Sequence, residues 1–342
     1  MSAPVRSGSP AFWPALALAF ALLALVAAGC ECAPERVHPC LGQVPARSAA
    51  IPADVVKGTP ASDFFPPLLR SAEFEDPVPW ASPVNTAGAE DSPFFSPDGS
   101  RFVFVFVPDV RVPVDKQMQD CTVGLWQTVR QGDGWSEPAR LLLSDDLALD
   151  GCPVIHGDTL WFCSVRAGNY REVDAYLATR QGDGWADWRN AGEQLNRERQ
   201  IGEWHLSADG NTLYFGAERG GGFGGLDLYA MLRSGDGWGE PVNLGATVND
   251  AGDQAMPCLS ADGSELWFNS NSKLGSTGPA TWRSQLQLDG SWGAAEEIVS
   301  NFAGEPNLDP DGNLYFVHHY MTDPAAGPIQ IVEADIYLAK RR

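Results

Sequence analysis

The chain has 342 residues, with 23 basic and 44 acidic side chains, so its formal net charge is −21. This excess of carboxylates argues against a nucleic-acid partner, because affinity for phosphate backbones depends on clustered Lys and Arg. Hydrophobic residues make up 44% of the chain, which is too apolar for a disordered protein. The 36 glycines and 26 prolines require many turns and leave little room for long helices, so the composition favours an all-β fold.

The first segment, residues 1–29, has the composition of an export signal. A single charge, Arg6, precedes an apolar stretch over 11–28, and the small residues Ala-Ala-Gly lead directly into Cys30. This ending resembles the lipobox of bacterial lipoproteins, in which the signal is cleaved before the cysteine and that cysteine is acylated. The resemblance implies that Cys30 carries lipid and anchors an exported protein in a bacterial membrane, with the outer membrane or cell surface favoured. A plain signal peptide and an uncleaved anchor helix are the alternatives.

The segment after the signal is rich in proline and alanine and shows neither helical nor strand periodicity. Such a composition is typical of a linker. The sequence therefore predicts three parts: a signal over 1–29, a semi-extended tether over 30–79 and a folded domain over 80–342.

Apart from Cys30, six cysteines remain, and none of them shows the spacing of a zinc site, so no metal site is predicted from them. An oxidising compartment favours disulfides. Cys152 and Cys163 lie on the two arms of one predicted hairpin and are the first choice, because opposed side chains on antiparallel strands come within bonding distance. A bridge that involves Cys121 also fits the pattern, and a local bridge from Cys32 to Cys40 is the alternative.

From residue 80 onward the chain repeats. Five turns of one type recur, and a short run of aromatic and branched residues follows each turn. Asp-Gly between two such runs predicts a hairpin, because both residues tolerate the positive φ of tight hairpin turns. The turns are Ser96–Gly99, His156–Asp158, Ser207–Gly210, Ser260–Gly263 and Asp309–Gly312. A third strand and a fourth strand follow each hairpin, and four strands in about 50 residues predict a β-propeller blade.

The two ends of this region predict how the ring closes. The last repeat ends after its third strand, which contains Asp335–Tyr337, and lacks a fourth. The start of the region supplies the missing strand, because Trp80, Pro83, Val84 and Asn85 match the spacing of Trp238, Pro241, Val242 and Asn243. We therefore expect a monomeric five-bladed propeller in which the N-terminal strand pairs into the last blade, since closure removes open sheet edges.

The repeats resemble the WD40-like, TolB-type propeller repeats of bacterial envelope proteins. The third repeat is the fullest match, with a Ser-x-Asp-Gly turn at Ser207–Gly210, a Leu-Tyr-Phe run, Arg219, a glycine-rich loop and Asp227–Tyr229. The resemblance covers 80–342 and implies an all-β fold of five blades with four antiparallel strands each. It carries little information about activity, because propellers support many functions.

Two repeats contain an Arg and an Asp at matching positions. These are Arg166 with Asp174 and Arg219 with Asp227, and the other repeats usually lack both residues. We interpret them as structural pairs at adjacent strand ends.

A carboxylate also precedes the first strand of every repeat. In a closed propeller these positions meet at one end of the channel, so we predict an acidic rim that could hold a cation such as calcium or a basic partner loop. The third repeat adds an aromatic ring and an imidazole where the others have proline, which indicates a recognition patch. The candidate residues are Glu90, Asp91, Asp150, Glu203, Trp204, His205, Asp253 and Glu305. Strand capping or simple solvation is the alternative role.

The sequence contains no Gly-x-Ser-x-Gly elbow, P-loop or HExxH motif. His318 and His319 are neighbours on a predicted strand and point to opposite faces, so they are not expected to share a metal. We therefore predict a non-catalytic scaffold without a cofactor that binds an envelope protein or glycan. A glycoside hydrolase that uses the rim carboxylates is the alternative, because five-bladed glycosidases place such groups in the central cavity.

Overall fold

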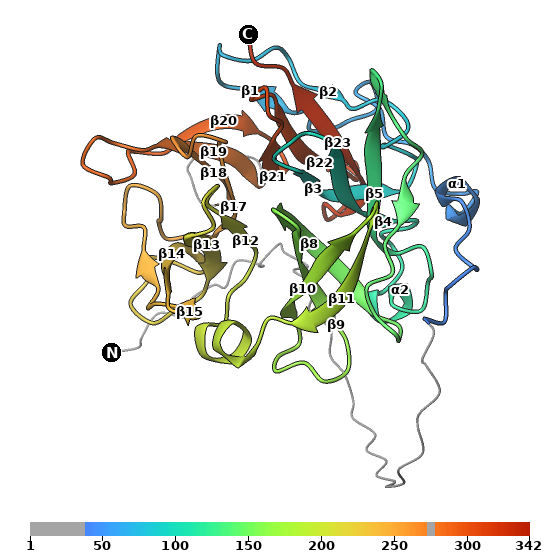
Figure 1. The fold of residues 1–342 in the computed structure, drawn as a ribbon. Helices are drawn as coiled ribbons and strands as arrows, with labels where there is room; N and C mark the ends of the chain where they lie inside the picture. Colours follow the sequence, from blue (N-terminus) through green and yellow to red (C-terminus); the bar gives the residue numbers. More distant parts are fainter. Residues whose placement is uncertain (1–37, 272–277) are drawn as a thin grey trace, which may run out of the picture.

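In the computed structural model, which describes residues 38–271 and 278–342, each predicted hairpin forms the inner part of one antiparallel sheet. The five sheets are arranged around a central axis, with their first strands innermost (Figure 1). The predicted all-β, five-bladed propeller is therefore confirmed.

The strands of each blade run from the centre outward. The first blade contains β3 (Ala89–Phe95), β4 (Arg101–Val107), β5 (Gly124–Gln131), β6 (Gly134–Trp135) and β7 (Ala139–Arg140). The second contains β8 (Leu149–His156), β9 (Thr159–Val165), β10 (Asp174–Gln181) and β11 (Gly184–Asn190). The third contains β12 (Trp204–Leu206), β13 (Thr212–Ala217), β14 (Asp227–Ser234), β15 (Gly237–Trp238) and β16 (Val242–Asn243).

The last two blades each recruit a strand from the N-terminal segment. The fourth contains β17 (Gln254–Leu259), β18 (Glu265–Ser270), β19 (Ala280–Gln285), β20 (Glu296–Ser300) and β1 (Leu68–Leu69). The fifth contains β21 (Ala303–Leu308), β22 (Leu314–Met321), β23 (Ile331–Ala339) and β2 (Val78–Pro79). Three short helices lie in the described connections, namely α1 (Arg47–Ala50), α2 (Val114–Gln117) and the π-helix η1 (Gln194–Arg199).

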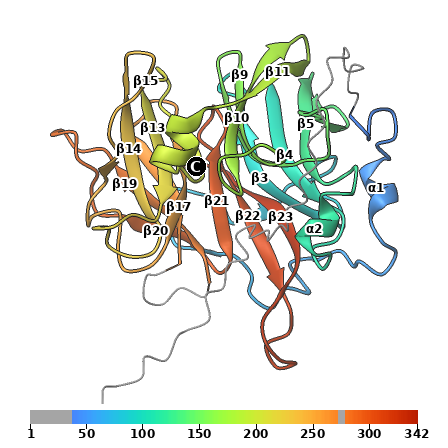
Figure 2. The ribbon, with the colours of Figure 1, turned by 90° about the horizontal axis from the view of Figure 1, so that it is seen from below.

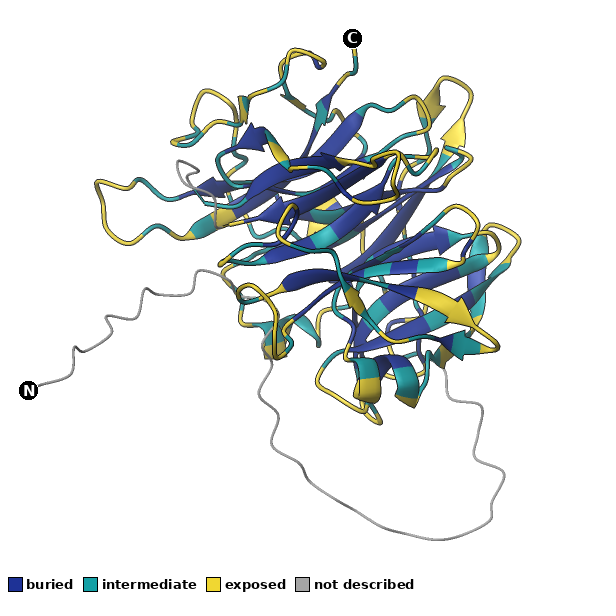
Figure 3. Cartoon of the chain, turned by 90° about the vertical axis from the view of Figure 1, so that its left-hand side faces the viewer, coloured by how far each residue is buried: buried dark blue, intermediate teal, exposed yellow. Residues whose placement is uncertain are grey.

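Each blade buries both faces of its central strands between its neighbours. On β4, Phe102, Phe104 and Phe106 point to one face and Val103 to the other, and all four are fully buried. Figure 3 shows the buried strands through the body of the propeller and the exposed turns at its surface. Alternating apolar residues on both faces thus specify strands that must be covered from two sides.

The recurring Ser-x-Asp-Gly turn has a local physical cause. In the third blade, hydrogen bonds from Ser207 and Asn211 lower the pKa of Asp209 to about 2, so the carboxylate stays charged and closes the turn. Gly210 follows with a φ of 69°, and a Cβ there would lie 2.7 Å from His156 of the second blade. The positive φ therefore favours glycine, and any larger residue would also have to displace the His156 ring.

The N-terminal strand closes the ring as predicted. β2 pairs with β23 through Val78 opposite Leu338 and Pro79 opposite Tyr337. The side-chain amide of Asn85 then donates to the carbonyl of Ile336 at 2.8 Å and accepts from its backbone N–H at 3.1 Å. The outer edge of the last strand is thus covered by residues that lie some 250 positions earlier.

The predicted register of this closing segment is wrong by six residues. Trp80 donates its backbone N–H to Ile336, as Leu244 does to Leu228 in the third blade, so Trp80 corresponds to Leu244 and not to Trp238. Asn249 pairs with both backbone groups of Leu228, which makes it the counterpart of Asn85. The match to Trp238 failed because Trp80 serves a different purpose. Its ring packs among Phe95, Phe102, Trp135 and Tyr315 between the last and first blades.

The segment 38–79, which we call the N-terminal strap, is not the extended tether that its composition predicts. It lies along the first, fifth and fourth blades (blue in Figure 2) and contributes β1 and β2 to two of them. Its side-chain contacts are Cys40 with Cys121, Arg47 with Glu90, Lys57 with Glu333 and Asp335, Asp63 with His318, and Glu73 with Arg283. The folded unit therefore begins well before residue 80.

The expected signal over 1–29 and the expected acylation site Cys30 lie outside the described residues. Within 38–271 and 278–342, no helix is long and apolar enough to cross a membrane.

The strap can be tested at Arg47. Its side chain is 4% exposed and lies 3.1 Å from Glu90, which is fully buried. Replacing Arg47 with Met should lower the free energy of unfolding by about 3 kcal/mol at pH 7, because Glu90 and the backbone carbonyl of Val84 then remain buried without the donor that satisfies them. Adding Glu90→Gln should recover part of this loss, and chemical denaturation measures both effects.

The matched control is Arg111→Met. Arg111 also pairs with a strap residue, Asp54, at 3.0 Å, but both side chains are at least half exposed. Its loss should leave the free energy of unfolding almost unchanged, because solvent screens an exposed ion pair. Equal stabilities for the Arg47 variant and the parent would mean that the strap is not part of the folded unit.

Candidate functional site in the central channel

A β-bulge in the innermost strand decides which side chains reach the channel. The pairing between the first and second strands shifts register at the bulge in the first, second, fourth and fifth blades. One residue of each bulge has a positive φ, namely Ser92 (50°), Cys152 (49°), Met256 (56°) and Glu305 (53°). A bulge re-aims the side chain of its extra residue, and these four residues line the cavity on the axis together with Glu203 of the third blade.

Three of the predicted carboxylates meet in this channel. Burial, followed by the nearby charge of Asp91, raises the pKa of Glu203 to about 8. Burial also raises the pKa of Glu305 well above its ordinary range, and Asp91, which hydrogen-bonds with the Glu305 carboxyl, adds to the effect. Two neighbouring carboxylates cannot both ionise easily in a desolvated site. Glu203 and Glu305 are therefore predominantly protonated at neutral pH.

Two histidines near the channel are neutral for the same reason. Burial, followed by the proximity of His156, lowers the pKa of His205 to about 4. Burial lowers the pKa of His319, and Asp91 opposes this shift. The imidazole of His205 lies 6.0 Å from the ring of Phe94, measured between centroids. The channel thus holds few full charges despite its titratable residues.

The space between these groups is small. The cavity has a volume of about 60 Å³, and its walls include Trp204, Met256, Cys258 and a proline from four of the five blades. This volume can hold one or two water molecules. A pocket for a drug-sized ligand is several times larger.

Trp204 is part of the core and is not an exposed platform. It is 5% exposed and packs against Trp161 with ring centroids 6.3 Å apart. All three residues of the predicted patch, Glu203, Trp204 and His205, line the small channel cavity.

The structure places the other predicted carboxylates away from the channel. Asp150 pairs with Arg166 at 2.8 Å, and Glu90 pairs with Arg47. Asp253 accepts hydrogen bonds from the side chain of Asn271 and the backbone of Leu226. Glu90 and Asp150 lie two residues before the bulge residues Ser92 and Cys152, and neither lines the channel cavity. The predicted acids therefore occupy four different positions along the inner strands, and they do not form one continuous ring at the channel rim.

The predicted Arg–Asp pairs are wrong. Arg166 bonds to Asp150 and stacks on Tyr176, whose ring centroid is 4.2 Å from the guanidinium carbon. Asp174 instead accepts from the backbone N–H of Tyr170 and from the side chain of Asn190. Its carboxylate closes the preceding loop, which explains why it recurs beside a glycine-rich segment.

Four cysteines form two disulfides. Cys152 is bonded to Cys163 across the hairpin of β8 and β9, the pair that opposed strand arms favour. Cys40 is bonded to Cys121, so the alternative bridge from Cys32 to Cys40 is not formed. Cys258 is a free thiol, and burial raises its pKa to about 12. Among the described residues, no group of three His, Cys, Asp or Glu side chains is arranged to hold a metal ion.

Comparisons with known proteins do not define an activity. No protein-family profile and no curated protein matches the chain. Similar solved structures include TolB from Acinetobacter baumannii, with 14% identity, a TM-score of 0.41, 75% of this chain covered and 55% of that one. The putative TolB from Agrobacterium tumefaciens has 18% identity, a TM-score of 0.40 and coverages of 75% and 91%. A thermostable family-43 glycoside hydrolase has 14% identity, a TM-score of 0.48 and coverages of 75% and 92%.

The raised pKa of Glu203 predicts a pH-dependent stability. A carboxyl that titrates near 8 in the folded state and at its ordinary value of 4.5 when unfolded favours folding at low pH, and this contribution is lost as the pH rises from 4.5 to 8. Glu203→Gln should therefore leave the free energy of unfolding almost unchanged at pH 5 and raise it by about 2 kcal/mol at pH 8.5.

Denaturant titrations at the two pH values measure this difference, with exposed Glu172→Gln as the control. A constant difference between Glu203→Gln and the parent across this range would contradict the assignment of a protonated Glu203.

Proposed function

We propose that the propeller is a non-catalytic module that binds a protein or glycan partner. The observation that carries this proposal is the crowding of the channel carboxyls. Glycosidases need a sugar between two carboxyl groups, which are about 5 Å apart in retaining enzymes and farther apart in inverting ones. Here Asp91 hydrogen-bonds directly with Glu305 in a cavity of about 60 Å³. No sugar ring fits between them.

The binding surface that we favour is the channel end where the loops between second and third strands emerge. These loops in the second and third blades expose Tyr170, Phe223 and Leu226, which are 47%, 48% and 37% accessible. Exposed aromatic side chains on neighbouring loops are typical anchors of a recognition surface.

The activity side of this proposal is tested with a panel of aryl glycosides. We expect no turnover by the parent protein and no change in Glu203→Gln. Turnover that this substitution abolishes would establish the hydrolase and overturn the scaffold.

The binding side is tested by capture from cell-envelope extracts. Tyr170→Ala with Phe223→Ala should reduce recovery of the captured partner at least fivefold. Leu288→Ala is the matched control, because Leu288 is fully exposed on a loop between third and fourth strands, at the opposite end of the blades. Equal losses in both variants would remove this face as the binding surface.

We also propose that the chain is exported and anchored through acylated Cys30. The lipobox-like ending of the signal supports this, and so do the disulfides Cys40–Cys121 and Cys152–Cys163, which persist in oxidising compartments.

Cells that express the parent should incorporate a fatty-acid probe into the protein and retain it with membranes, since two or more acyl chains hold a protein stably on a bilayer. Cys30→Ala should lose the label and accumulate as a longer precursor. An unlabelled parent would leave Cys30 as an ordinary residue near a signal cleavage site.

A further inference from the structure

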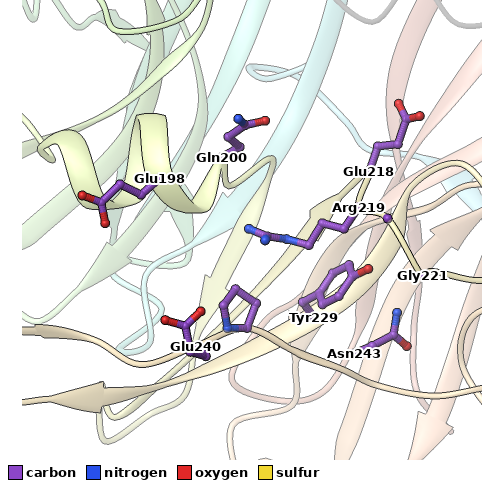
Figure 4. A pocket seen from close by; sticks show the side chains of 10 residues that line it. Glu198, Gln200, Glu218, Arg219, Gly221, Tyr229, Glu240 and Asn243 are labelled. Carbon is purple, nitrogen blue, oxygen red and sulfur yellow. The ribbon is translucent and has the colours of Figure 1, made fainter.

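A larger cavity lies outside the channel, on the third blade (Figure 4). Its volume is about 500 Å³, which is within the range of small-molecule sites. The walls come from η1, from the loop that follows β13, from β14 and from the outer segment around β16. Figure 4 shows Arg219 extending into the space between these walls, with Tyr229 beside it.

Comparison with the second blade shows that Arg219 has lost its internal partners. The matching Arg166 donates to Ser164, to the carbonyl of Leu143 and to Asp150, so its guanidinium is occupied within the fold. In the third blade the strand registers place Ala217 where Ser164 lies and Ile201 where Asp150 lies. Neither replacement can accept a hydrogen bond from its side chain.

Arg219 is nevertheless held in place. Its guanidinium carbon lies 5.5 Å from the ring centroid of Tyr229 and 5.9 Å from that of Phe215, and one nitrogen donates to the backbone carbonyl of Arg199. Asp227 fixes the loop that follows Arg219, because its carboxylate accepts a hydrogen bond from the backbone N–H of Phe223 at 2.7 Å. The buried Nε of Arg219 has no hydrogen-bond partner among the described residues. A positioned guanidinium with unused donors is suited to a planar carboxylate.

The charges around the pocket restrict the ligand further. Glu198, Glu218 and Glu240 lie on its walls, and Glu240 pairs with Arg199 at 2.7 Å. The walls therefore carry three acids and one base, Arg219, and the acids remain in excess when Arg199 beside Glu240 is counted as well. A purely anionic ligand would meet net repulsion here, whereas a ligand with one cationic and one anionic group would match both signs.

We propose that this pocket binds a small zwitterion, a free amino acid or short peptide, whose carboxylate pairs with Arg219 and whose ammonium group lies among the glutamates. This inference goes beyond the binding function proposed above, because the pocket is lined by other residues than the surface with Tyr170, Phe223 and Leu226 and takes a small ligand. It also accounts for Ala217 and Ile201 in the third blade, which leave Arg219 without the side-chain acceptors that Ser164 and Asp150 offer to Arg166 in the second.

Isothermal titration calorimetry with L-alanyl-L-alanine tests the proposal. The N-acetylated dipeptide and the dipeptide amide each lack one charge, and both should bind at least tenfold more weakly. Arg219→Gln should weaken binding of the parent dipeptide at least tenfold. Arg233→Gln is the matched control, because Arg233 stacks on Trp238 in the same blade but does not line the pocket, and it should bind normally.

A second variant keeps the test independent of folding. Glu218 is exposed, so Glu218→Gln should fold normally, weaken the dipeptide about threefold or more and leave the N-acetylated form unaffected. Absence of dipeptide binding, or binding of glucuronic acid that is as tight as that of the dipeptide, overturns the zwitterion proposal. Retained capture of an envelope partner by Arg219→Gln, together with absent dipeptide binding, would leave the proposed scaffold function intact. Turnover of glycosides would instead overturn that function.

Discussion

Closure of the ring by the strap is the constraint on which the rest of the structure depends. A blade buries its faces only against two neighbours, so an open ring would leave β23 with an unpaired edge and one face uncovered. β2 supplies the pairing, and the strap fixes it from the side through the fully buried pair of Asp63 and His318, whose atoms lie 2.7 Å apart. Closure also brings the five inner strands together, which creates the channel and sets its narrow width.

The crowded channel carries an energetic cost that the fold limits by protonation. Burying several charged carboxylates without cations is unfavourable, so the protonated, neutral form of these acids has the lower free energy. Asp91 is the member that influences both Glu203 and Glu305. Elsewhere in the blades a cation lies beside the buried acid, as in the pairs of Glu90 with Arg47 and Asp150 with Arg166. Burial remains the larger effect at Glu90, because it raises the pKa of that carboxyl to about 8 even though Arg47 is in contact with it.

Departures from the repeat are more informative about function than the repeat itself. The shared turn, the loop-closing Asp and the amide that pairs with the backbone of the third strand all serve the scaffold, as Asp227 and Asn249 show in the third blade. The third blade then replaces two partners of its arginine by Ile201 and Ala217 and leaves a pocket beside Arg219. A repeat protein can change one blade in this way because each blade contacts mainly its neighbours.

The sequence by itself determined the hairpins, the five blades and the closing role of the N-terminal segment, because turn chemistry and strand periodicity are local. It also placed Asp91, Glu203 and Glu305 near one end of the channel. Tertiary structure alone decided that these three meet while Glu90, Asp150 and Asp253 do not, since a single bulge residue changes the face on which a side chain lies. The strap escaped prediction because isolated side chains such as Arg47 and Lys57 make its contacts, and long-range contacts of this kind leave no periodic pattern in the chain.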